Sequence, residues 1–262
     1  MTLITDPDRD WELWGRTNPY FGVLTDSKYL RANLNEDAFR EFFATGERHI
    51  EHVYGVIRAK LRQTFRPFQV LDYGCGVGRL LAPLAKRSRA VVGVDISAAM
   101  LEEAKENCKR DGVASVRLLH YDELGVLQPA SFDLVHSFIV FQHIPVARGE
   151  LILRRLLNLI AEGGVGAIHL TYHDSALAAR SLLWRSLKSV SRHLELVHGL
   201  SNLIRRRPFS TPFMEMNSYN MNRIFNILID ANCSNLHVEF SDHNLMRGAM
   251  LYFEKSTSPL SL

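Results

Sequence analysis

The sequence predicts an α/β protein built on a doubly wound, mostly parallel sheet. From residue 68 onward, short apolar runs alternate with helical patterns, as in FQVLDY, GRLLAPLAKRS, AVVGVDI and SAAMLEEAKENCKRD. Strands that recur between helices of this length are typical of βαβ units and a parallel sheet. Hydrophobic residues make up 47% of the chain and charged residues 23%, which is the balance of a folded globular protein.

Five strands are predicted in the central part of the chain. They are the runs FQVLDY, AVVGVDI, SVRLLHY, FDLVHSFIVF and VGAIHLTY. A helix, VARGELILRRLLNLIAEGG, separates the last two, and Gly163 and Gly164 are predicted to stop it. Near the end, SYNMNRIFNILIDANC is predicted as a helix capped by Ser218. It is followed by two runs, LHVEFS and AMLYFEK, that are close enough to pair antiparallel.

Two segments lie outside this pattern, so we divide the chain into 1–66, a helical N-terminal extension, and 67–262, the main domain. The extension contains a long predicted helix over 37–65. The second segment, 174–217, is inserted after the fifth strand and has apolar residues at helical spacing. Its first part is basic, with seven Lys and Arg against two acidic residues in 174–210.

Composition narrows the function classes. The formal net charge of +3 is too small to indicate nucleic-acid binding by itself. The three cysteines, Cys75, Cys108 and Cys233, form no CxxC pair, so neither a zinc site nor a disulfide framework is expected. The N-terminus does not resemble a signal peptide, and no run approaches the ~18 uncharged apolar residues of a membrane span. We therefore expect a soluble cytoplasmic protein.

The stretch VLDYGCGVGRL places glycines at alternate positions after the first strand. Glycine allows positive φ and close approach of a ligand, and a helix starting near Gly78 would direct its N-terminal amides there. The pattern GxGxG differs from the GxGxxG of dinucleotide sites. Asp72 precedes the turn, and a carboxylate repels a pyrophosphate but attracts an ammonium group. The turn therefore favours a ligand that carries a cation.

Acidic residues follow the next two strands. Asp95 lies 19 residues after Gly76 and ends the second strand, where a carboxylate can accept both hydroxyls of a ribose. Asp122 follows the third strand at the same edge of the sheet, where it could accept an adenine amino group. Amino acid, ribose and adenine would then lie across three successive strand ends.

The motifs VLDYGCGVGRL, VVGVDIS and FDLVHSFIVFQHIP resemble those of the class I S-adenosylmethionine-dependent methyltransferases, over residues 68–172. The resemblance implies a Rossmann-like sheet of seven strands with an antiparallel last strand, and S-adenosyl-L-methionine as the cofactor, with S-adenosyl-L-homocysteine as the product. It assigns to cofactor binding Asp72, Gly74, Cys75, Gly76, Gly78, Asp95, Ile96, Tyr121, Asp122, Ser137, Phe138, Gln142 and, as a lid residue of the aromatic N-terminal segment, Tyr20. The alternative for Tyr20 is an aromatic ring that packs against the core.

Three residues are predicted to act in catalysis. Methyl transfer requires a held nucleophile and, for a hydroxyl, a base. His143 follows the fourth strand, and Tyr172 and His173 follow the fifth, on the edge where the methyl should lie. The alternatives are a helix-capping His143 and a loop at 172–173 that bonds its own backbone. The strand histidines, His136 and His169, are interpreted as core residues. His49 and His52 lack a third partner for a metal.

The sequence thus predicts a methyltransferase that acts on an oxygen or nitrogen of a small molecule, anionic or lipid-like. The insertion is predicted to cover the substrate, and 176–207 could contact an anionic membrane. The alternatives are an accessory protein that binds S-adenosylmethionine without turnover, an NAD-dependent oxidoreductase, which Asp72 disfavours, and a nucleic-acid methyltransferase. The last is disfavoured because the arginine cluster at 205–207 is small. In addition, the fourth strand ends in SFIVFQ instead of an NPPY-like or PC-type motif.

Overall fold

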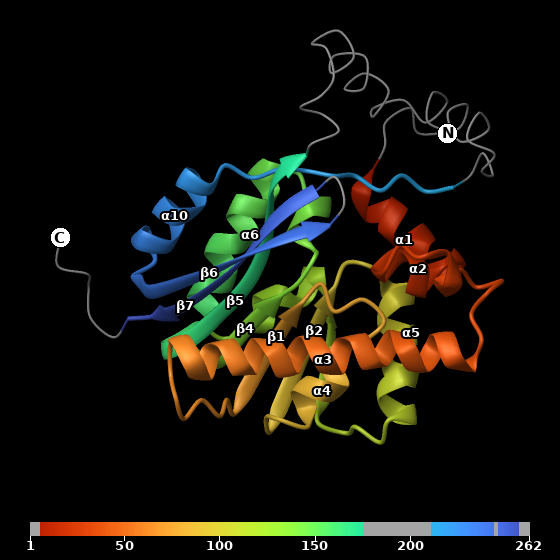
Figure 1. Ribbon diagram of the computed structural model, residues 1–262, viewed down its shortest axis with the longest axis horizontal. Helices are drawn as coiled ribbons and strands as arrows, with labels where there is room; N and C mark the ends of the chain where they lie inside the picture. Colours follow the sequence, from red (N-terminus) through yellow and green to blue (C-terminus); the bar gives the residue numbers. More distant parts are fainter. Residues whose placement is uncertain (1–5, 175–210, 244–245, 257–262) are drawn as a thin grey trace, which may run out of the picture.

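The centre of the protein is a mixed sheet with helices on both faces (Figure 1). The computed structural model describes residues 6–174, 211–243 and 246–256. Within them the strand order is β3-β2-β1-β4-β5-β7-β6. The strands are β1 (Gln69–Tyr73), β2 (Ala90–Asp95), β3 (Val116–His120), β4 (Phe132–Ser137), β5 (Ile160–Asp174), β6 (Cys233–His243) and β7 (Met246–Lys255). The first five are parallel and β7 is antiparallel to β5 and β6, as predicted.

The helices form two layers around this sheet. One layer contains α3 (Glu36–Lys60), α4 (Leu81–Ala85) and α5 (Ala98–Arg110), and the other contains α6 (Val146–Leu159) and α10 (Met221–Asp230). Each layer buries its own hydrophobic cluster against the sheet. The α3 helix runs across the sheet in Figure 1. Its N-cap is Asn35, whose side chain accepts a hydrogen bond from the Ala38 amide.

The N-terminal segment continues this packing as α1 (Pro7–Thr17), α2 (Pro19–Val23) and the 3-10 turn η1 (Ser27–Tyr29). A third cluster of buried side chains joins these elements to the glycine turn and to α5; its members include Trp14, Tyr20, Phe42, Val77 and Met100. The extension is therefore packed on the main domain at the end of the sheet that carries the glycine turn (Figure 1).

Several predicted boundaries differ from the structure. The α3 helix ends at Lys60 instead of residue 65, and α10 is capped by Asn220 instead of Ser218. Between them in the chain, α6 ends at Leu159, before the predicted stop at Gly163 and Gly164. The reason is that Ile160 already pairs with Phe132 of β4, so the chain enters the sheet before it reaches the two glycines.

The helix after the glycine turn is also shorter than predicted. It begins at Leu81 and has five residues, and the chain from Gly74 to Leu80 forms turns. The predicted helix start near Gly78 is therefore wrong. Contacts to a ligand at this point must come from the turn itself.

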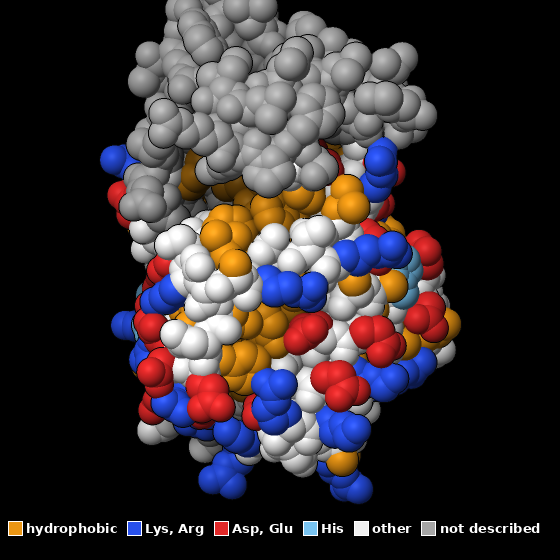
Figure 2. Space-filling model, turned by 90° about the vertical axis from the view of Figure 1, so that its right-hand side faces the viewer, with side chains coloured by type: hydrophobic (Ala, Val, Ile, Leu, Met, Phe, Trp, Pro, Cys, Tyr) orange, Lys and Arg blue, Asp and Glu red, His pale blue; other side chains and the backbone are white. Residues whose placement is uncertain are grey.

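The surface formed by the right-hand side of Figure 1 carries charges of both signs. Figure 2 shows Lys and Arg side chains interspersed with Asp and Glu around exposed apolar side chains. Among the described residues, no helix combines the length and hydropathy that crossing a bilayer requires. The insertion, which was predicted to be helical and basic, lies outside the described residues for 175–210.

Two glycines of α3 provide a matched test of how this helix docks. A Cβ added at Gly46 would lie 2.2 Å from the Arg79 carbonyl oxygen, whereas one at Gly55 would meet nothing within 4 Å. We expect Gly46→Ala to lower the free energy of unfolding by about 1–3 kcal/mol through overpacking. Gly55→Ala should raise it by about 0.5–1 kcal/mol because alanine favours the helix. Urea denaturation measures both, and equal effects would contradict this docking.

Candidate functional site

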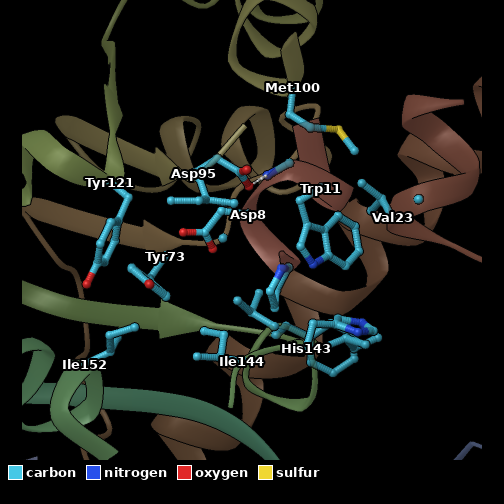
Figure 3. Close-up of a pocket in the computed structure, with 18 of the residues that line it drawn as sticks. Asp8, Trp11, Val23, Tyr73, Asp95, Met100, Tyr121, His143, Ile144 and Ile152 are labelled. Carbon is cyan, nitrogen blue, oxygen red and sulfur yellow. Dashed lines mark hydrogen bonds between the residues drawn. The ribbon is translucent and has the colours of Figure 1, made fainter. Parts of the chain in front are cut away.

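A cavity lies at the carboxyl ends of β1, β2 and β4, where open α/β sheets bind ligands. Figure 3 shows side chains from α1, from the strand ends and from the loop after β4 around one space. Of the residues that sequence reasoning assigned, those that line the cavity are Gly74, Gly76, Asp95, Ile96, Tyr121, Phe138 and His143.

The glycine turn has the backbone that its sequence predicts. Gly74, Gly76 and Gly78 have φ values of 76°, 52° and 82°, in the region that favours glycine. A Cβ at Gly74 would lie 2.2 Å from Cγ2 of Val140. The Gly74 amide donates to the carbonyl oxygen of Val94 at 2.7 Å, so the turn is fixed to the end of β2.

Asp95 connects the second strand to the glycine turn. Its Oδ2 accepts a hydrogen bond from the Gly76 amide at 2.8 Å (Figure 3). Its Oδ1 accepts one from the Ser97 amide at 2.9 Å. Burial raises the pKa of the carboxyl group. A carboxylate has about four lone-pair sites, so Asp95 can still accept hydroxyl groups from the cavity.

Beneath the turn are two buried charged groups, each with one atom that no described residue satisfies. Asp72 accepts a hydrogen bond from His136 at Oδ1, but its Oδ2 has no partner. Arg79 donates from Nη1 to Thr45, whereas its Nε has no partner. An unsatisfied buried polar atom is costly. These two groups therefore fit the ammonium and carboxylate of an amino-acid ligand, as the predicted S-adenosylmethionine requires.

The α1 helix supplies a wall of the cavity that sequence reasoning did not assign. Asp8 and Trp11 line it, and Asp8 pairs with Arg148 of α6 at 2.6 Å. The Arg148 guanidinium lies 5.0 Å from the ring centre of Tyr121. Glu12 accepts hydrogen bonds from the Ser97 hydroxyl and the Ala99 amide, at the start of α5. The aromatic run WELWG is the sequence signal that could have identified this wall.

Tyr20 lies elsewhere than its predicted lid position. Its ring is buried against Phe42, and its hydroxyl donates to Glu103 Oε1 at 2.6 Å. Asn107, which also lies within 3.1 Å of this hydroxyl, donates to the carbonyl oxygen of Val77. Tyr20 does not line the cavity. Its ring packs in the same buried cluster as Val77 of the glycine turn, so Tyr20 supports the turn from the side away from the cavity.

Six other residues assigned to the cofactor do not line the cavity: Asp72, Cys75, Gly78, Asp122, Ser137 and Gln142. The Asp122 side chain is 81% exposed and lies 3.2 Å from His120 Nδ1, so its position does not support the predicted adenine contact. The Ser137 hydroxyl donates to the Tyr73 carbonyl and ties β4 to β1. Cys75 is buried, which raises the pKa of its thiol. Gly78 packs against Ala104 of α5.

His143 is the one predicted catalytic residue that lines the cavity. Its Nδ1 donates to the carbonyl oxygen of Glu215 at 2.8 Å, so its Nε2 is the accepting nitrogen, 3.0 Å from Gln142 Nε2. Gln142 in turn accepts from the Thr171 hydroxyl. Burial lowers the pKa of His143 to about 4, so the ring is neutral near pH 7.

The two predicted residues on β5 do not line the cavity. The Tyr172 ring packs at 5.9 Å from the Phe240 ring, and His173 pairs with Arg247 of β7 in the sheet. The sheet continues past the expected strand end at Tyr172, so both residues belong to β5 instead of a loop.

The buried, neutral His143 makes stability depend on pH. Unfolding returns its pKa from about 4 to about 6.5, so between these values the unfolded state binds more protons. The free energy of unfolding should therefore fall as the pH decreases from 6.5 to 4, by about 3 kcal/mol from this group. His143→Gln should remove this part of the slope in urea denaturation series. His237→Gln, at a partly exposed histidine of β6, should leave the slope intact.

Comparison with known proteins gives the same assignment for the central part of the chain. Residues 70–164 match the family model described as a methyltransferase domain. The chain is 30% identical over 129 residues to a ubiquinone biosynthesis O-methyltransferase of Methylococcus capsulatus, and 36% identical over 127 residues to a 23S rRNA (uracil(1939)-C(5))-methyltransferase of Aeromonas hydrophila. These matches cover 47% and 40% of this chain. They span 54% and 29% of the relatives, which is about half of their length or less.

Among solved structures, the magnesium protoporphyrin IX methyltransferase of Synechocystis PCC 6803 with bound S-adenosylhomocysteine has the same fold. The TM-score is 0.63 at 17% identity, and the match covers 96% of this chain and 100% of that one. The family match includes the glycine turn, Asp95 and the loop after β4, which form part of the cavity wall. Residues 70–164 therefore form a methyltransferase domain, and the described residues have the fold of the class I S-adenosylmethionine-dependent methyltransferases.

Proposed function

We propose that this protein transfers a methyl group from S-adenosylmethionine to an oxygen or nitrogen of a small molecule. The observation that carries the proposal is Asp95, whose carboxylate holds the glycine turn and faces the same cavity. When bound, S-adenosylmethionine supplies a methyl group on a positively charged sulfur. The protein must hold this group and the acceptor in line.

The cavity offers one set of contacts for each part of the cofactor. Asp95 would accept the ribose hydroxyls, and the rings of Tyr121 and Trp11 with the Arg148 guanidinium would surround the adenine. The loop after β4 would face the sulfur. There Ile139 has a φ of 62°, which is strained for a β-branched residue and is typical of functional loops.

His143 is proposed as the proton acceptor for a hydroxyl substrate. The Glu215 carbonyl fixes the ring so that Nε2 carries the lone pair, and Nε2 is held by an amide hydrogen bond that an acceptor hydroxyl could replace. A role for Tyr172 and His173 in catalysis or in binding the methyl acceptor remains a prediction.

Three observations favour a small-molecule acceptor over a nucleic acid. The described surface in Figure 2 mixes both signs of charge, whereas nucleic-acid sites gather basic residues. The Methylococcus relative and the Synechocystis structure are both named for small-molecule acceptors. The match to the ribosomal RNA enzyme spans 29% of that protein. A cytoplasmic location and a membrane contact through 176–207, outside the described residues, remain part of the proposal.

The cofactor assignment is tested by calorimetric titration with S-adenosylhomocysteine. We expect Asp95→Ala to weaken binding by about 10- to 100-fold, because the ribose loses charge-assisted hydrogen bonds and the turn loses its anchor at Gly76. Asp122→Ala is the matched control and should change affinity less than twofold, since its side chain faces solvent. No binding to the unaltered protein at millimolar ligand would refute the proposed function.

Turnover distinguishes an enzyme from an accessory protein that only binds the cofactor. With S-adenosylmethionine and a panel of phenols and amines, we expect equal amounts of methylated product and S-adenosylhomocysteine by mass spectrometry. For a hydroxyl acceptor, His143→Gln should slow transfer by about 100-fold or more while cofactor affinity is retained. An unchanged rate would show that His143 is not the base.

A further inference from the structure

A hydrogen-bond chain of three side chains, Asp72, His136 and His49, runs beneath the glycine turn from the sheet into α3. Asp72 of β1 lies opposite His136 of β4 in the sheet register, and its Oδ1 is 2.8 Å from His136 Nδ1. His136 Nε2 is 3.0 Å from Nε2 of His49, on α3. Asp72 is 1% exposed and His136 is fully buried. Sequence reasoning interpreted His136 as a core residue and His49 as a poor metal ligand, and did not connect them.

The tautomers of the two histidine rings set the direction of this hydrogen-bond chain. A neutral His136 that donates from Nδ1 to Asp72 has Nε2 as its accepting nitrogen. His49 must then donate from its own Nε2. Burial lowers the pKa of His49, which agrees with a neutral ring.

If this hydrogen-bond chain had only a structural role, both oxygens of its carboxylate would be expected to have partners. Here Oδ1 is satisfied and Oδ2 has no partner in the part of the chain that the structure describes. Arg79, which is 5% exposed and lines the cavity, also leaves Nε without a partner and forms no ion pair with Asp72 there. Arg79 thus lines the cavity, whereas Asp72 lies behind the wall that Gly74 and Gly76 form.

We propose that His136 and His49 are positioning residues for the amino-acid end of the cofactor. They hold the Asp72 carboxylate so that Oδ2 receives the ammonium group, while Arg79, held by Thr45, receives the carboxylate. The proposal rests on the proposed function, because it assigns roles within the same site. The centres of the His49 and Phe138 rings are 3.9 Å apart, so the hydrogen-bond chain ends against a residue of the cavity wall.

The test compares S-adenosylhomocysteine with 5′-methylthioadenosine, which lacks the amino-acid end. Asp72→Asn and His136→Leu should each weaken S-adenosylhomocysteine by about tenfold or more, the effect of losing a charge-assisted hydrogen bond. Both variants should bind 5′-methylthioadenosine within twofold of the unaltered protein. The ratio of the two affinities is the readout, because a general loss of packing would weaken both ligands alike.

Conservative variants separate hydrogen bonding from packing. His49→Leu removes the donor to His136 and should lower the affinity ratio. His49→Gln keeps an amide donor near the position of Nε2 and should restore it. His136→Asn keeps the donor to Asp72 and should bind S-adenosylhomocysteine better than His136→Leu. An unchanged ratio in His136→Leu, or equal losses for both ligands, would overturn the inference. Absence of binding by the unaltered protein would instead refute the proposed function.

Discussion

The Asp95 carboxylate accepts the amide of Gly76, and this bond joins the end of β2 to a turn that three positive φ angles have already bent. The Val94 carbonyl adds a second attachment through Gly74. Both bonds depend on β1 and β2 lying side by side in parallel, with Asp72 beside Gly93 in the register. The position of the cavity follows from these bonds, because its other walls pack around the turn.

The two faces of the turn have different environments. Toward the cavity, the backbone of Gly74 and Gly76 lies open to a ligand. Behind it, Asn107 and Tyr20 satisfy or cover polar groups, and Gly46 lets α3 approach the Arg79 carbonyl closely. Packing on the far side thus keeps the near side in place without occupying it. This division explains how a loop that is rich in glycine can be both rigid and accessible.

Most of the correct predictions came from patterns among residues that are close together in the sequence. Strand and helix periodicity predicted the sheet, and the spacing of Gly76 and Asp95 predicted the core of the site. Long-range contacts could not be predicted, because a single sequence does not show which distant side chains meet. Asp8 and Arg148, or His49 and His136, are separated by 140 and 87 residues. The exposed position of Asp122 depends on the turn that follows β3, which the pattern HYDEL does not specify.

Asp8 and Trp11 of α1 form part of the cavity wall. The free energy of docking this helix and the free energy of binding a ligand in the cavity are therefore coupled. Thermodynamic linkage makes this relation reciprocal: a ligand that contacts α1 strengthens its attachment by the same factor by which the attached helix strengthens the ligand. Glu12 fastens the helix to the start of α5, and Asp8 fastens it to α6. The docking of α1 thus reports on the state of a site built mainly by residues much further along the chain.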